Sequence, residues 1–205
     1  MSKTLSVFAV SLGLVLVSAR HVAASPITFE AFADGDALTN QIAGLTFANT
    51  NVLSAGVSLN ETEYPPHSGS NVVVDAGGAI TVAFATPVAA VSGFFTYGVP
   101  LLFSAFDSTN NLIGTAASSF NANTALSGDA GSSPNEFLEL LSPLGIASIV
   151  ILGDPAGQSF TLDDLTVTPF PDTTPVPEPS TLVLLGFGVA EAYRRIRRRS
   201  TSEQV

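Results

Sequence analysis

The sequence predicts an all-β protein, a β-sandwich most like a jelly roll. The chain between Pro26 and Thr168 shows no helical hydrophobic period of useful length. It carries instead short runs of alternating or β-branched apolar residues, which are typical of strands. Gly, Asn, Asp and Pro separate these runs and indicate turns. About nine or ten such runs in roughly 140 residues favour a sandwich or barrel.

Each expected strand has an apolar face or a β-branched centre. Ile80, Val82 and Phe84 share one face of the run AITVAFA, because side chains alternate along a strand. Ser108–Asn111 is the expected hairpin turn, since Asn accepts a positive φ. The expected strands are Ile27–Phe32, Gly44–Ala48, Asn71–Val74, Ala79–Ala85, Val88–Tyr97, Leu101–Asp107, Leu112–Phe120, Asn135–Leu141, Ala147–Leu152 and Ser159–Val167.

Residues 1–24 are predicted to be a signal peptide. Lys3 supplies the positive start, and Leu5–Val17 is an apolar run of thirteen residues. That run is shorter than the about 20 helical residues that cross a bilayer. Small residues before the junction place cleavage between Ala24 and Ser25. The mature chain is therefore expected outside the cytoplasm, with residues 25–168 as its folded domain.

The charges are distributed very unevenly. The net charge is -10, and all seven Lys and Arg lie in the first twenty or last twelve positions. Between Ser25 and Glu178 there are fifteen Asp and Glu, and His67 is the one basic residue. Without cations this domain cannot neutralise phosphates, which excludes nucleic-acid binding, and anionic lipid surfaces would repel it. Its carboxylates must be solvated, capped by backbone N–H groups, or bound to external cations.

The C-terminal segment combines a linker, a short apolar run and a basic cluster. Residues 169–178 form a Pro-rich, extended linker. Residues 180–193 are the apolar segment, and residues 194–199 are basic. Because basic residues stay on the cytoplasmic side, the domain would lie outside and the tail would hold it there. The basic stop consists of Arg194, Arg195, Arg197, Arg198 and Arg199.

This order of parts, over residues 176–199, resembles the PEP-CTERM sorting domain of Gram-negative bacteria. The sequence VPEPST at Val176–Thr181 precedes the apolar segment and the arginines. The resemblance implies export across the inner membrane and processing by an exosortase, an integral-membrane cysteine protease-like enzyme. It also implies an association with exopolysaccharide and biofilm. Carried over residue by residue, the recognition triplet is Pro177, Glu178 and Pro179.

The apolar segment departs from that pattern. Glu191 stands where the family usually has a small or apolar residue. A helix from Pro179 to Tyr193 spans roughly 22 Å, against a hydrocarbon core of about 30 Å. Membrane contact is therefore expected to be transient, with local thinning and Glu191 near the cytoplasmic interface.

The domain itself resembles ectodomains that accompany such tails. The shared features are the segments TFEAFADGD, GLTF, VSGFFTY…LLFSAFD and SFTLDDLTV. Domains of this kind look like galactose-binding-like jelly rolls, which bind carbohydrate in other proteins and often hold a structural Ca²⁺. Fold analogy alone does not give function.

A calcium site is the first candidate chemistry. Ca²⁺ takes about six to eight oxygen ligands, many of them carboxylates. First and last strands of a jelly roll commonly lie side by side, which would bring the acids of the opening and closing segments together. The alternative is that the opening pair shapes a turn at Gly35 and one closing acid faces solvent. The candidate ligands are Glu30, Asp34, Asp36, Asp163 and Asp164.

A carbohydrate site is the second candidate. Such a site pairs an aromatic platform with carboxylates and amides, and Tyr64, Tyr97 and Phe120 are the candidate platforms. The alternative role of these aromatics is core packing. The residues near the first platform are Asn60, Glu63 and His67.

Catalysis has the weakest signal. His67 lies in the loop sequence YPPHSGSN, and no G-x-S-x-G element accompanies it. Among fifteen acids a chance carboxylate pair is easy to find. The preferred interpretation is a non-enzymatic cell-surface or matrix protein that binds polysaccharide, with Ca²⁺ as a possible cofactor. A secreted carbohydrate-active hydrolase is the alternative. An ice-binding role, which also occurs with this type of tail, has no regular Thr array to support it.

Overall fold

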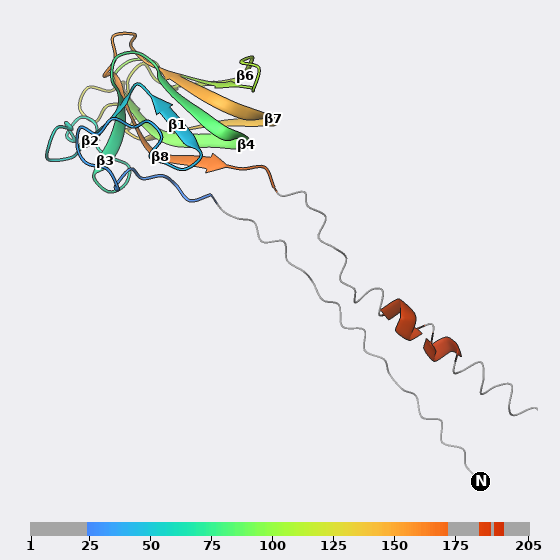
Figure 1. Ribbon diagram of the computed structural model, residues 1–205. Coiled ribbons are helices and arrows are strands. Elements are labelled where there is room, and N and C mark those ends of the chain that lie inside the picture. The colour runs from blue at the N-terminus through green and yellow to red at the C-terminus, as the bar shows by residue number, and fades with distance from the viewer. Residues whose placement is uncertain (1–23, 172–184, 190, 195–205) are drawn as a thin grey trace, which may run out of the picture. The chain divides into compact units, whose positions relative to one another are not determined.

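The computed structural model describes residues 24–171, 185–189 and 191–194 (Figure 1). The chain divides into two units, with the boundary between Phe170 and Pro171. The described part of the first unit is an antiparallel β structure. The all-β, β-sandwich class predicted from the sequence is therefore confirmed.

Eight strands build the described part of the first unit. Their order in the hydrogen-bonded path is β2-β3-β8-β4-β7-β5-β6, and β1 pairs with β4. The strands are β1 (Leu45–Ala48), β2 (Thr50–Ser54), β3 (Asn71–Asp75), β4 (Ile80–Tyr97), β5 (Leu102–Phe106), β6 (Leu112–Ala117), β7 (Glu136–Leu152) and β8 (Phe160–Thr168).

Two long strands, β4 and β7, belong to both layers of the sandwich. The first part of β4 pairs with β1 and with the last part of β7. The second part of β4 pairs with β8 and with the first part of β7. One layer is therefore β1–β4–β7–β5–β6, and the other is β2–β3–β8–β4–β7. We call the second one the β2–β8 layer.

The bends in β4 and β7 correct the sequence prediction of four separate strands. The register of this pair shifts between Ala83 and Ala90. Pro87 lies in the bend of β4, and Gly145, with φ of 89°, lies in the bend of β7. A Cβ on Gly145 would come within 2.9 Å of Pro87, so the close contact of the two bends favours glycine there. Residues of this type resemble strand ends in the sequence, although the strands continue through them.

Two further predictions about strands need correction. Ile27–Phe32 is not a strand: Ile27 forms an isolated bridge with Leu165, and Phe29 has φ of 62°. Strand β2 was not predicted, because its sequence TNVLS is largely polar. It follows β1 directly through Asn49, which has φ of 63°.

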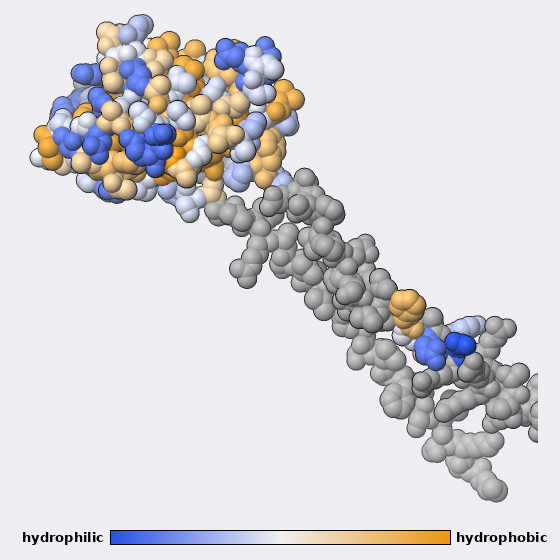
Figure 2. Space-filling model, in the orientation of Figure 1, coloured by the Kyte–Doolittle hydropathy of each residue, from blue (hydrophilic) through white to orange (hydrophobic). Residues whose placement is uncertain are grey.

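The main core lies between the two layers. Its side chains come from both, for example Phe47 and Phe103 from one and Phe95 and Leu162 from the other. Tyr97, a candidate sugar platform, is fully buried in this core, and Phe120 packs partly buried against it. On the visible face of the unit, hydrophobic residues are interspersed with hydrophilic ones (Figure 2).

The second unit is described at two short helical stretches, residues 185–189 and 191–194. Glu191 and Arg194 form an ion pair of 4.0 Å. None of the helices that the structure describes is long and apolar enough to cross a membrane. The predicted triplet Pro177–Pro179, most of the basic stop and residues 1–23 lie outside the described residues.

Candidate functional site

The outer face of the β2–β8 layer carries a cleft of about 370 Å³. Its floor is largely apolar, with Leu53 of β2 and Val74 of β3, and Phe160 of β8, a residue of the main core, also borders it. Leu59, from the β2–β3 loop (residues 55–70), adds to this floor. The loop packs on the sheet through a small apolar cluster that is separate from the main core. The volume falls within the range of about 300–1,000 Å³ that is typical of ligand sites.

The rim of the cleft is polar and has one aromatic ring. Tyr64 of the β2–β3 loop provides that ring and is half-buried. Amides and hydroxyls surround it, each able to donate or accept a hydrogen bond. Of these polar residues, Ser58, Asn60 and Gln158 come from loops, whereas Asn51 and Thr161 come from the strands β2 and β8 of the floor.

Tyr64 is held from its N-terminal side. Its backbone N–H donates to the carbonyl of Asn60 at 2.8 Å. The preceding Glu63 accepts hydrogen bonds from the backbone N–H and the hydroxyl of Ser127. Burial raises the pKa of Tyr64, and the charge of Glu63 raises it further. The Tyr64 hydroxyl therefore keeps its proton at neutral pH.

Asp75 shapes the end of the cleft where β3 finishes. Its carboxylate is fully buried and accepts hydrogen bonds from the backbone N–H groups of Gly77, Gln158 and Ser159. Gly157, with φ of 90°, precedes Gln158 and lies against this carboxylate. The role of Asp75 is therefore to fix the backbone that presents the Gln158 side chain.

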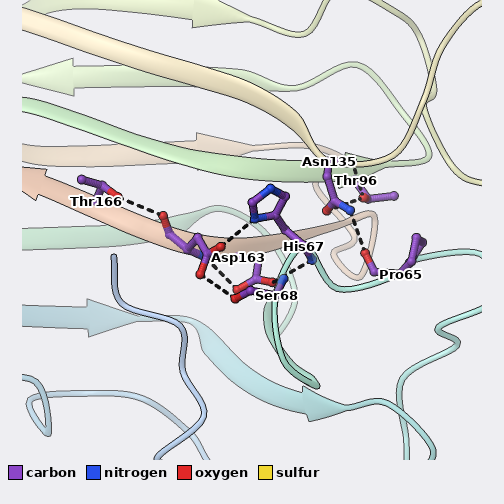
Figure 3. Close-up of polar contacts among 8 residues, drawn as sticks. Pro65, His67, Ser68, Thr96, Asn135, Asp163 and Thr166 are labelled. Atoms are coloured by element: carbon purple, nitrogen blue, oxygen red, sulfur yellow. Dashed lines mark hydrogen bonds and ion pairs between the residues drawn. The ribbon is translucent and has the colours of Figure 1, made fainter. Parts of the chain in front are cut away.

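The closing-strand acids bind the β2–β3 loop (Figure 3). Asp163 Oδ2 accepts from the backbone N–H groups of His67 at 2.8 Å and Ser68 at 2.9 Å. Asp164 contacts His67 Nδ1 at 2.6 Å and accepts from Ser68 Oγ at 2.8 Å. Burial raises the pKa of Asp163 to about 6, although three backbone N–H groups act against that rise.

The opening-segment acids bind other backbone groups. Glu30 accepts from the N–H groups of Ser70 at 2.9 Å and Asn71 at 2.7 Å. Burial disfavours its ionisation, but these hydrogen bonds lower the pKa of Glu30 on balance. Asp34 accepts from the Ser54 N–H at 2.7 Å, and Asp36 from the Ala33 N–H at 2.8 Å.

The five predicted calcium ligands are thus only partly brought together. The bridge between Ile27 and Leu165 places the opening segment beside the closing strand, and the charge of Asp164 acts on Glu30. Within the described residues, no three His, Cys, Asp or Glu side chains are grouped to hold a metal. Calcium binding stays a prediction, which thermal melts with and without EGTA test. Equal midpoints would contradict it.

The sequence found part of the cleft and missed the rest. Tyr64 and Asn60 were predicted together and both line it. Glu63 and His67 lie within three positions of Tyr64 in the chain but are not in the lining. Asn51 of β2, Gln158 of the β7–β8 connection and Thr161 of β8 were missed, because they carry no local motif of their own.

Comparison with known proteins identifies the tail. Residues 175–199 match the PEP-CTERM protein-sorting motif. The resemblance seen in the sequence is confirmed, and the chain carries the sorting signal of an exported protein. A comparison with curated proteins gives no match.

Several solved structures are similar to the first unit at low identity. A cleaved adhesin domain of Lys-gingipain is 17% identical, with 70% of this chain and 98% of that chain covered and a TM-score of 0.44. TmCBM61, solved with beta-1,4-galactotriose, is 12% identical, with 62% and 89% covered and a TM-score of 0.37. The CBM22-1 xylan-binding domain from Paenibacillus barcinonensis Xyn10C is 14% identical, with 72% and 97% covered and a TM-score of 0.35. At these scores the ligand of this chain has to be inferred from its own residues.

Proposed function

We propose that this is a non-enzymatic cell-surface or matrix protein that binds an uncharged polysaccharide in the cleft beside Tyr64. The observation that carries the proposal is the composition of the cleft. An apolar floor lies beneath a rim of amides, hydroxyls and one aromatic ring. A sugar ring presents apolar C–H faces and a polar edge of hydroxyls, so it matches both parts of such a cleft.

The preference for an uncharged ligand follows from the charges of the domain. No Lys or Arg lies between Ser25 and Glu178, so an anionic sugar finds no cation there. Asp75 is the one charged side chain in the cleft lining, and it is buried against backbone N–H groups. A uronic acid would meet repulsion without compensation, because removing a carboxylate from water is costly.

Export and sorting set where this binding takes place. The PEP-CTERM motif supports an exosortase as the processing partner. The arginine cluster supports a transient contact of the tail with the inner membrane before processing. The domain then acts in the cell envelope or outside the cell, where polysaccharide is available.

The test is a binding series with the exported protein. Titration calorimetry or affinity electrophoresis would compare uncharged polysaccharides with uronic-acid and sulfated ones. Tyr64→Ala is expected to weaken binding about tenfold or more, which corresponds to about 1.4 kcal/mol. Phe170→Ala is the matched control, because Phe170 is an exposed aromatic that does not line the cleft.

Two results would contradict the proposal. Equal affinity of the Tyr64→Ala and wild-type proteins would remove the cleft as the binding site. Release of reducing sugar that vanishes when a single carboxylate is replaced would show a hydrolase instead. Binding without turnover supports the proposal.

A further inference from the structure

We infer that Asp163 and Asp164 are positioning residues for Tyr64, because they clamp the loop segment that carries it. The inference rests on the proposed function of the cleft. Neither acid lines the cleft, so neither contacts a ligand bound there. Their effect on binding must pass through His67 and Ser68. We call these four residues the latch.

A bulge in β8 allows both acids to reach the same loop. In a regular strand, consecutive side chains point to opposite faces. Opposite Ser92 and Phe94 of β4 the register of β8 shifts, and Asp164 takes φ of 49°. The extra residue lets Asp163 and Asp164 both act on the β2–β3 loop, as bulges re-aim side chains elsewhere. The Asp164 N–H donates to Asp163 Oδ1 at 2.7 Å, which ties the two acids to each other.

The imidazole ring of His67 is held on a face as well as at an edge. It stacks on Phe94 of β4 with ring centroids 3.5 Å apart and planes 7° apart. Phe94 in turn contacts Phe137 of β7, with centroids 5.4 Å apart. The hydrogen bond from Nδ1 to Asp164 sets the rotation of the ring in this stack. His67 is therefore fixed relative to three strands of the sheet.

Two prolines carry this constraint to Tyr64. Pro65 and Pro66 separate Tyr64 from His67, and each fixes its own φ near −65°. The carbonyl of Pro65 accepts a hydrogen bond from Asn135 Nδ2 at 3.2 Å (Figure 3). With so few free dihedral angles between them, a displacement of His67 moves the Tyr64 ring. Without the latch, Tyr64 would keep its anchor at Glu63, its packing on the small apolar cluster and the Pro65–Asn135 hydrogen bond, and would lose the constraint from His67.

The experiment uses Tyr64→Trp as a reporter in the exported chain. The sequence has no Trp, so the emission of this variant reports on position 64 alone. In this background Asp164→Ala is expected to weaken polysaccharide binding about tenfold and to shift the emission to longer wavelength. Asp164→Asn, which keeps an acceptor oxygen, is expected to restore part of both. Ser68→Ala, which removes one hydrogen bond, provides a milder variant should Asp164→Ala fold poorly.

The matched control is Asp107→Ala. Asp107 also accepts backbone hydrogen bonds in a loop, from Thr109 and Asn111, but it lies in the β5–β6 turn outside the cleft. Its replacement is expected to leave affinity and emission unchanged. An equal loss in Asp107→Ala would mean that the losses reflect general destabilisation, and the inference would fail.

The outcomes separate the inference from the function on which it rests. Unchanged affinity and emission in both Asp164→Ala and Ser68→Ala would overturn the latch while polysaccharide binding stands. Should no uncharged polysaccharide bind the wild-type protein, the proposed function fails, and the emission of the reporter still decides the positioning. An emission shift in Asp164→Ala without one in Asp107→Ala would then support the latch.

Discussion

In this domain single carboxylates hold loops in place, a role that salt bridges have in many other proteins. Asp163 is 1% exposed and accepts three backbone N–H groups, from His67, Ser68 and Asp164. Asp75 and Asp107 bind backbone N–H groups in the same way. Of the three environments open to carboxylates in a domain without Lys or Arg, capping by backbone N–H groups is widely used. Each such acid fixes a loop, since it joins donors that the sheet leaves unpaired.

The pKa of Asp163 gives a pH prediction. The ordinary pKa is 3.8, and burial raises it to about 6 in the folded chain. Between pH 3.8 and about 6, Asp163 is protonated in the folded protein and ionised in the unfolded chain. The free energy of unfolding contributed by Asp163 is therefore greatest below pH 4 and falls as pH rises to 6, by on the order of 3 kcal/mol.

Melting curves from pH 3 to 8 test this in wild-type protein and Asp163→Asn. The amide cannot ionise, so the difference in midpoint between the two proteins is expected to change between pH 4 and 6 and to be constant above 7. The variant also has one acceptor oxygen fewer, which lowers its midpoint at every pH. A difference that does not vary with pH would contradict the raised pKa.

At the scale of elements, local pattern predicts strands but not their continuity. Alternation at Ile80, Val82 and Phe84 correctly marks the start of β4, and all three are buried. Pro87 and Gly145 suggested strand ends, although tertiary pairing carries both strands through them. The bulge at Asp164 was also out of reach, because its positive φ is imposed by β4 and by the loop rather than by local sequence.

Gly157 offers a prediction about the connection between β7 and β8. A Cβ there would lie 2.3 Å from Gly77 Cα and 2.4 Å from Asp75 Oδ1, and φ is 90°. Gly157→Ala is expected to destabilise by strain and by a backbone clash, and to disturb Gln158 in the cleft. Gly131→Ala is the matched control, since φ there is 86° and nothing lies within 4 Å.

Urea denaturation of the two glycine variants separates the causes. Gly131→Ala carries only the strain of a positive φ, about 1 kcal/mol. Gly157→Ala is expected to lose at least about 2 kcal/mol more, in line with overpacking and the disturbed Asp75 hydrogen bonds. Equal losses in the free energy of unfolding would show that the backbone at residues 157 and 77 moves apart at little cost.

At the scale of the whole molecule, the sequence predicts the fold class and the sorting signal, but only part of the cleft. Spacing of turns and strands gave the sandwich, and the tail motif is contiguous in the sequence. The cleft depends on the pairing of β3 with β8, which joins residues about ninety positions apart. Tyr64 and Asn60 could be predicted together because they share one loop. Gln158 and Thr161 become neighbours of that loop only in the folded chain.

The last prediction concerns the tail: a change in the sorting motif is expected to alter processing and to leave polysaccharide affinity unchanged. The motif at residues 175–199 lies in the second unit, and the cleft lies in the first. Replacing Pro177, Glu178 and Pro179 together by Ala is expected to leave unprocessed chain with the membrane fraction, because the proposed contact of the arginines with the membrane would remain. Pro171→Ala, outside the motif, is the control and should be processed normally. Cell fractionation with mass spectrometry of the C-terminus gives the result. Normal processing of the triple variant would contradict recognition of the triplet, and altered polysaccharide affinity would contradict the independence of the two units.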